Sequence, residues 1–135
     1  MTIPYRLQGE NCCYYITSRG DGRKDIYKTE TDYLKFPEYI QKGKERYQFY
    51  LYAYVLMTNH YHLLIETTQA NISRIMQYLN TSYTTYYNVK KKKSGHLFQG
   101  RYKSILVEKD NYFLELSRYI HLNPVRAKLV PKAII

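Results

Sequence analysis

The sequence lacks tryptophan, has only two cysteines, and contains no apolar run long enough to span a membrane. Cys12 and Cys13 are adjacent, so they cannot form a disulfide framework. Because no CxxC spacing is present, we expect one of them to be a small buried apolar side chain rather than a metal ligand. The amino terminus has no hydrophobic core typical of a secretion signal. These absences predict a protein without a membrane span that works in the cytoplasm.

Acidic residues are scarce, since 11 Asp and Glu stand against 21 Lys and Arg, for a net charge of +10. This excess favours a polyanionic partner, with nucleic acid ahead of an anionic membrane. The 18 tyrosines are unusual for a chain of this length. Tyrosine can fill a core while its hydroxyl stays in water, and it can also stack on exposed bases. We expect most of them to be core side chains, with the basic and aromatic surface suited to single-stranded nucleic acid.

A length of 135 residues suits one domain, residues 1–135, and no repeat, low-complexity stretch or linker divides it. Composition and periodicity predict strands over residues 11–18, 49–57, 60–67 and 96–108, and helices over 29–47, 72–87 and 112–122. The tail after the last helix is short and basic.

The order of these elements matches the split βαβ pattern of a ferredoxin-like α+β fold, an antiparallel sheet with helices on one face, followed by a C-terminal helix. Pro37 is expected to bend or divide the first helix, which Thr29 or Thr31 would cap. Asn71 is the expected cap of the second helix, and Gly100 would interrupt the fourth strand as a bulge.

Two histidines lie in the stretch LYAYVLMTNHYHLLIETT (residues 51–68), which we expect to form two strands joined by a turn. Side chains two apart in a strand point to the same face, so His60 and His62 would face one way and Tyr61 the other. Two neutral imidazoles can bind a divalent metal ion. A lone His-x-His pair is more often a pair of ordinary polar residues, so a metal site needs partners from elsewhere in the chain.

The last predicted helix offers such partners. Tyr119 and Asn123 project from the same side of it, one turn apart. A tyrosine hydroxyl can attack a phosphodiester that a metal ion polarises. An asparagine oxygen can join two imidazoles and leave coordination positions open, which suits Mg²⁺ or Mn²⁺. Spacing alone does not single out Tyr119 among 18 tyrosines, and a half-buried helical tyrosine is the alternative.

Three separated motifs occur in order: VLMTNHYHLLIET, HLFQGRYKSILVEKD and RYIHLNPVRAKLV. The opening stretch YYITSRGDGRKDIY agrees with them. From about residue 5 to residue 130 the sequence resembles the HUH single-tyrosine transposases, which include insertion-sequence enzymes and REP-associated tyrosine transposases.

The resemblance implies a role for each matching position. His60 and His62 would bind the divalent metal, Tyr119 would be the nucleophile, and Asn123 would be the third ligand. Such enzymes cut single-stranded DNA, often beside a hairpin, form a 5′-phosphotyrosine bond, release a 3′-OH and rejoin the strand by the reverse reaction. The chain departs from REP-associated members in one respect, because it has no Gly-Thr-Trp-aromatic motif near its first strand. The resemblance therefore does not extend to the recognition of REP-type hairpins.

Basic side chains on or near these motifs are expected to contact DNA phosphates, with a solvated surface as the alternative: Arg101, Lys103, Lys90, Lys91, Lys92 and Lys93. The resemblance leaves open a monomer or a homodimer, and binding to DNA would bring the protein to the nucleoid. Two other functions remain possible at this point. One is a non-catalytic single-stranded nucleic-acid-binding module, and the other is a metal-dependent nuclease that uses water.

Overall fold

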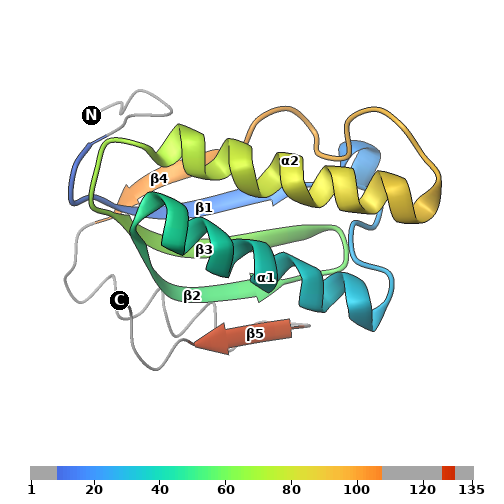
Figure 1. Ribbon diagram of the computed structural model, residues 1–135, viewed down its shortest axis with the longest axis horizontal. Helices are drawn as coiled ribbons and strands as arrows, with labels where there is room; N and C mark the ends of the chain where they lie inside the picture. Colours follow the sequence, from blue (N-terminus) through green and yellow to red (C-terminus); the bar gives the residue numbers. More distant parts are fainter. Residues whose placement is uncertain (1–8, 108–125, 130–135) are drawn as a thin grey trace.

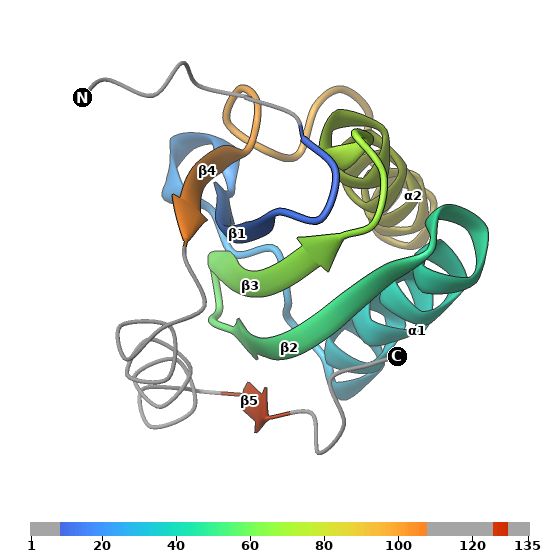
Figure 2. The same cartoon turned by 90° about the vertical axis from the view of Figure 1, so that its left-hand side faces the viewer.

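The computed structural model describes residues 9–107 and 126–129, and of the latter only the backbone. Its elements, in chain order, are β1 (Cys13–Arg19), the short 3₁₀ turn η1 (Asp21–Arg23), α1 (Glu30–Tyr47), β2 (Phe49–Leu56), β3 (His60–Thr67), α2 (Ile72–Lys91), β4 (Lys103–Val107) and β5 (Arg126–Leu129). The strands form one antiparallel sheet in the order β4-β1-β3-β2-β5, and α1 and α2 cover one of its faces (Figure 1, Figure 2). The predicted ferredoxin-like α+β fold is confirmed.

The core between sheet and helices is largely aromatic. Tyr61 from β3 packs against Phe36 from α1, with ring centroids 4.6 Å apart, and Tyr83 from α2 also contacts Phe36. Two of these hydroxyls are satisfied inside the core: Tyr61 donates to Asn80 Oδ1 at 2.5 Å and Tyr83 donates to the carbonyl of Ile26 at 2.5 Å. The expectation that tyrosine serves as core material is therefore confirmed at these positions.

A buried carboxylate joins the start of α1 to the end of α2. Asp32 forms a capping box with Thr29, and it also accepts hydrogen bonds from the backbone N–H of Lys28 and the hydroxyl of Tyr86. Its carboxylate pairs with lysines on the last turn of α2 as well. Burial alone would raise the pKa of Asp32, but these hydrogen bonds and lysines hold it well below its usual range.

The sheet face away from the helices, called here the open face, bears a second apolar cluster. Its members are buried: Cys13, Ala53, Val55, Leu64 and Val107. Both cysteines are free, and Cys13 lies inward as expected for a small apolar side chain. The open face also holds the two histidines, as described below.

Several predicted boundaries differ from the structure. α1 is not divided at Pro37. α2 continues beyond residue 87 to Lys91 and ends at Lys92, its C-cap, which adopts the left-handed conformation. The predicted strand over residues 96–108 is reduced to β4, since Gly100 has φ +64° and the chain before it makes only an isolated bridge to β1. β5 was not predicted at all. The predicted helix over residues 112–122 lies outside the described residues.

The caps of the two helices follow the prediction in part. Thr29, not Thr31, caps α1 through its side chain. Asn71 occupies the N-cap position of α2, but its side chain makes no capping hydrogen bond there. Its amide instead donates to the carbonyl of Tyr47 at 3.2 Å, which ties the start of α2 to the end of α1.

Candidate active site

His60 and His62 both lie on the open face of β3. The antiparallel register places Arg19 opposite His60 and Thr17 opposite His62, so these four side chains share one face. Tyr61, between the histidines, is fully buried on the helix side. The predicted orientation of the pair is therefore confirmed, and it follows from the two-residue period of the strand.

Each imidazole is held through its Nδ1 atom. His60 Nδ1 lies 2.8 Å from Asn59 Oδ1, and because an amide oxygen only accepts, this nitrogen bears the proton. His62 Nδ1 lies 2.8 Å from the Tyr15 hydroxyl and 3.1 Å from Thr17 Oγ1, and its ring stacks on that of Tyr15. With each Nδ1 held in this way, Nε2 is the ring nitrogen that could bind a metal ion, as in histidines that bind metals.

The surroundings keep both rings neutral at pH 7. Burial, and then the neighbouring His60, lower the pKa of His62 to about 4. Burial, and then the charge of Arg19, lower the pKa of His60 below its usual value. The two ring centroids are 4.9 Å apart and the ring planes are nearly perpendicular, at 88°. Two neutral imidazoles this close are a suitable donor pair for one divalent ion.

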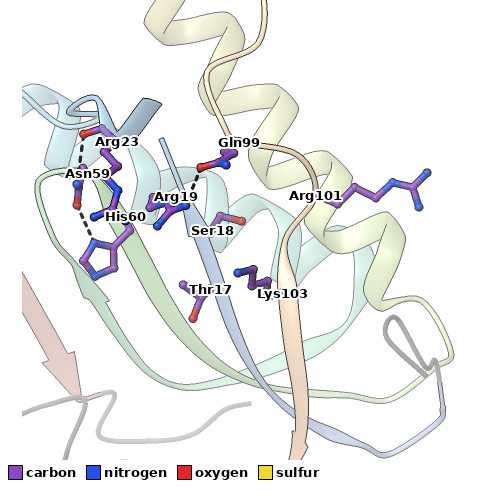
Figure 3. A pocket seen from close by; sticks show the side chains of 9 residues that line it. All are labelled: Thr17, Ser18, Arg19, Arg23, Asn59, His60, Gln99, Arg101 and Lys103. Carbon is purple, nitrogen blue, oxygen red and sulfur yellow. Dashed lines mark hydrogen bonds between the residues drawn. The ribbon is translucent and has the colours of Figure 1, made fainter. Parts of the chain in front are cut away.

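A cavity of about 400 Å³ opens beside His60. It is lined by Thr17, Ser18, Arg19, Arg23, Asn59, His60, Gln99, Arg101 and Lys103 (Figure 3). One wall is the segment before β4, which is fixed to the end of β1 by the bridge between Gly20 and Phe98 and by the hydrogen bond from Gln99 N to Arg19 O, 2.8 Å. This cavity is called here the basic pocket.

The predicted DNA contacts divide into two groups. Arg101 and Lys103 line the basic pocket, although Arg101 points away from the other labelled side chains (Figure 3). The four lysines lie instead at the end of α2, where Lys90 and Lys91 pair with Asp32 at 3.1 and 3.2 Å. Arg101 and Lys103 therefore line the same pocket as His60, whereas the lysine run lies elsewhere.

The other predicted site residues have different positions. Tyr119 and Asn123 lie outside the described residues. Glu66, on the same face of β3, accepts a hydrogen bond from the Tyr52 hydroxyl. His96 pairs with Asp21 at 3.2 Å on the surface. Within residues 9–107, no cluster of three or more His, Cys, Asp or Glu side chains could hold a metal ion.

Sequence reasoning missed several residues that surround the pair. Tyr15 and Thr17 fall in the predicted strand over residues 11–18 and Arg19 directly follows it, but no sequence pattern links them to the histidines. The period of β1 puts all three on one face, but only the register with β3 shows that this face is the one that the histidines occupy. No sequence pattern predicts that Gln99 lies beside Arg19, because its position depends on the isolated bridge between Gly20 and Phe98.

Comparison with known proteins adds family information to this geometry. The family model described as "Transposase IS200 like" matches residues 9–123. Comparison with curated proteins gave no match. None of the helices in the described part of the chain is long and apolar enough to cross a membrane.

Three solved structures share the fold. A REP-associated tyrosine transposase bound to a REP hairpin has a TM-score of 0.75 at 18% identity, over 93% of this chain and 73% of that one. A putative transposase from Deinococcus radiodurans R1 has a TM-score of 0.60 at 15% identity, over 92% and 97% of the two chains. The tRNA(His) guanylyltransferase of Saccharomyces cerevisiae has a TM-score of 0.56 at 8% identity, over 90% and 62%. At these identities the likeness concerns the fold alone.

Proposed function

The chain belongs to the IS200-like transposase family, and we propose that it cuts and rejoins single-stranded DNA through a covalent bond to Tyr119. The observation that best supports this proposal is the way in which neighbouring side chains hold His60 and His62 neutral and in fixed orientations. Both rings are neutral, both Nδ1 atoms are held by polar neighbours, and both rings face the open side of the sheet. Histidines of ordinary surface character do not need such neighbours.

The donor set fits a divalent ion, Mg²⁺ or Mn²⁺. His60 and His62 would supply nitrogen ligands, and the side-chain oxygen of Asn123 would supply the third, with positions left for phosphate oxygens and water. When bound, the ion would withdraw negative charge from the scissile phosphate.

The connection between β4 and β5 is the chain segment that would bring Tyr119 to the histidines. Residues 108–125 join two strands at opposite edges of the sheet, about 19 Å apart at a spacing of about 4.8 Å per strand. The helices α1 and α2 already cover the other face. Neither described helix covers the open face, which holds the histidines (Figure 2). We propose that Tyr119 and Asn123, on the chain between β4 and β5, act together with His60 and His62.

In the proposed reaction, Tyr119 loses its phenolic proton and its oxygen bonds to the phosphorus of the scissile phosphodiester. The bond from phosphorus to the 3′ oxygen breaks, and that oxygen takes up a proton to leave as a 3′-OH. The energy of the broken ester is kept in the phosphotyrosine, so the reverse reaction can rejoin the strand without nucleotide hydrolysis. Cationic side chains of the basic pocket neutralise the phosphate during both steps.

The first test is a denaturing gel of protein mixed with labelled single-stranded DNA that contains a hairpin, with Mg²⁺ or with EDTA. We expect a covalent protein–DNA adduct with Mg²⁺ only, and no adduct from Tyr119→Phe or His60→Ala. Tyr112→Phe, which removes a tyrosine hydroxyl from the same segment, is the matched control and should retain the adduct. An adduct formed by Tyr119→Phe would reject Tyr119 as the nucleophile.

The same gel separates the two competing functions. A nuclease that uses water would release cut DNA with Mg²⁺ but leave no adduct after denaturation. A non-catalytic binding module would neither cut DNA nor respond to His60→Ala.

The proposed partner is single-stranded or hairpin DNA. A relative of the same fold was solved bound to a REP hairpin, and the positive charge and the basic pocket suit a DNA strand in this chain. Because the chain has no tryptophan, it lacks the Gly-Thr-Trp-aromatic motif of REP-associated enzymes, so we propose that its hairpin is of another type. We also propose that it acts in the cytoplasm, at the nucleoid when bound to DNA.

A further inference from the structure

Cationic side chains from three separate parts of the chain line the basic pocket: Arg19, Arg23, Arg101 and Lys103. None of the nine lining residues, all within the described chain, is acidic. Asp21, which lies next to this pocket in η1, pairs instead with His96 at 3.2 Å. A concave site with several positive charges and no internal counter-charge attracts an anion.

Arg19 is the cation most closely tied to the histidines. It is the last residue of β1 and the direct cross-strand neighbour of His60. Its charge is one of the causes that lower the pKa of His60. Within residues 9–107, Arg19 has no carboxylate partner. Its guanidinium donates one hydrogen bond, to Gln99, which leaves further N–H groups for a ligand.

Gln99 holds Arg19 in this position. Arg19 Nη2 donates to Gln99 Oε1 at 2.7 Å, and the backbone N–H of Gln99 donates to the carbonyl of Arg19 at 2.8 Å. Gln99 is therefore linked to Arg19 through both its side chain and its backbone. Figure 3 shows the two side chains next to each other, with Ser18 and Lys103 nearby. An amide oxygen orients a guanidinium without neutralising it, so the full positive charge stays available to the pocket.

We infer that the basic pocket binds a phosphate of the DNA strand adjoining the scissile bond, with Arg19 as the contacting residue and Gln99 as its positioning residue. This inference rests on the proposed function, since it assigns the pocket to that same substrate. Guanidinium matches the planar geometry of two phosphate oxygens, and its hydrogen bonds to charged oxygen are about twice as strong as neutral ones. A held arginine loses less side-chain entropy on binding than a free one.

The test measures DNA binding in EDTA, so that it is independent of metal and of strand cleavage. The probe is a fluorescein-labelled single-stranded oligothymidylate, followed by anisotropy at several salt concentrations. We expect Arg19→Ala to weaken affinity about tenfold and to reduce the slope of log K against log salt by about 0.7, the share of one phosphate contact in single strands. Lys42→Ala also removes one positive charge, but from α1, on the helix-covered side of the sheet. It should change neither the affinity nor the salt slope.

Substitutions at Gln99 separate positioning from a purely structural role. Gln99→Glu is nearly isosteric but would pair with Arg19 as an ion, so it should reduce affinity as strongly as Arg19→Ala. Gln99→Ala leaves Arg19 charged but removes the side-chain hydrogen bond that orients it. It should therefore reduce the affinity for the oligothymidylate only about threefold. Arg19→Lys keeps the charge and loses the planar fork, so it should restore the salt slope but not the affinity. Circular dichroism of each variant checks the fold.

The outcomes separate this inference from the proposed function. If Arg19→Ala binds the probe like Lys42→Ala, Arg19 is not the phosphate contact, even if the covalent adduct forms with the wild-type chain. If Gln99→Glu and Gln99→Ala weaken binding equally, Gln99 does not act through the charge of Arg19. If the predicted ranking holds but no adduct forms in the gel with Mg²⁺, the pocket is confirmed as a phosphate site and the transposase chemistry is rejected.

Discussion

The hydroxyl of Tyr15 and the side-chain amide of Asn59 hold the rings of His62 and His60 through their Nδ1 atoms. The sequence alone predicts that His60 and His62 share a face, because this follows from the period of one strand. The groups that hold their Nδ1 atoms come from β1 and from the turn before β3. Their contacts depend on register, and a single strand does not determine its register. The pair could therefore be predicted, but not the groups that hold it.

Removing the Tyr15 hydroxyl should weaken metal binding. Tyr15→Phe keeps the ring that stacks on His62 but loses the 2.8 Å hydrogen bond to Nδ1. Loss of an outer hydrogen bond to a ligand histidine costs about 10- to 100-fold in metal affinity. We expect Mn²⁺ binding, measured by electron paramagnetic resonance, to weaken by about tenfold. Tyr47→Phe, on α1, serves as the control, and equal affinities for the two variants would contradict a role for Tyr15.

The buried Asp32 should make stability depend on acid pH. Its folded pKa lies below the unfolded value of about 3.9. Its contribution is therefore present above about pH 4 and is lost as pH falls toward the folded value. We expect Asp32→Asn to lower the free energy of unfolding at pH 7 by about 2 to 3 kcal/mol, because Lys90 and Lys91 lose their partner.

Urea unfolding at pH 7 and at about pH 3 measures this effect. The difference between wild type and Asp32→Asn should shrink as the pH falls below about 4, because Asp32 then gains a proton in the unfolded wild type while the folded carboxylate stays charged. Glu38→Gln, which removes an exposed ion pair with Lys35 and Lys42, should change stability little. A difference between wild type and Asp32→Asn that is constant with pH would contradict the assigned pKa of Asp32.

At the scale of elements, α1 illustrates how capping sets a boundary. Two candidates two residues apart, Thr29 and Thr31, precede the apolar pattern, and propensity does not separate them. The structure selects Thr29, because its hydroxyl accepts from Asp32 N while the Asp32 carboxylate accepts from Thr29 N. Thr29→Ala should therefore lower stability by about 1 kcal/mol, measured by thermal denaturation. Thr31→Ala, two residues further along and exposed, should leave stability unchanged or raise it slightly. Equal losses of stability from Thr29→Ala and Thr31→Ala would contradict Thr29 as the cap.

Long elements with a clear hydrophobic period were predicted well, and short ones were not. α2 and β3 begin at the predicted residues, since their apolar positions repeat. β4 is shorter than predicted, because Gly100 adopts a positive φ and the residues before it pair with β1 only once. β5 has four residues and no pattern of its own. It becomes a strand only because the edge of β2 offers it a partner.

At the scale of the whole molecule, the sheet order determines how distant parts of the chain can meet. The histidines lie on β3, in the middle of the sheet, and the segment with Tyr119 joins its two edges. Both ends of this segment are attached to the same sheet, through β4 and β5. We therefore predict that the proposed active site is formed within one chain, although the sequence resemblance allows a dimer that exchanges its last helix.

Mixing two inactive variants tests this arrangement. Tyr119→Phe lacks the nucleophile and His60→Ala lacks a metal ligand. If each site is formed by one chain, an equimolar mixture should give no more covalent adduct than either variant alone. Adduct restored to about a quarter to a half of the wild-type level would show that the tyrosine acts on the partner's site, as in exchanged dimers.

The central claim is that Tyr119 becomes bonded to DNA, and mass spectrometry of the trypsin-digested adduct tests it most directly. Trypsin cleavage after Arg118 and Arg126 yields residues 119–126, YIHLNPVR, in which Tyr119 is the sole tyrosine. If the bulky adduct blocks the first cut, the longer peptide from residue 110 also contains Tyr112, and fragmentation distinguishes the two. We predict a nucleotide mass on Tyr119, formed only with Mg²⁺ or Mn²⁺ and absent from His62→Ala. A nucleotide on Tyr112 or any other residue, or cut DNA with no modified peptide, would contradict the proposed mechanism.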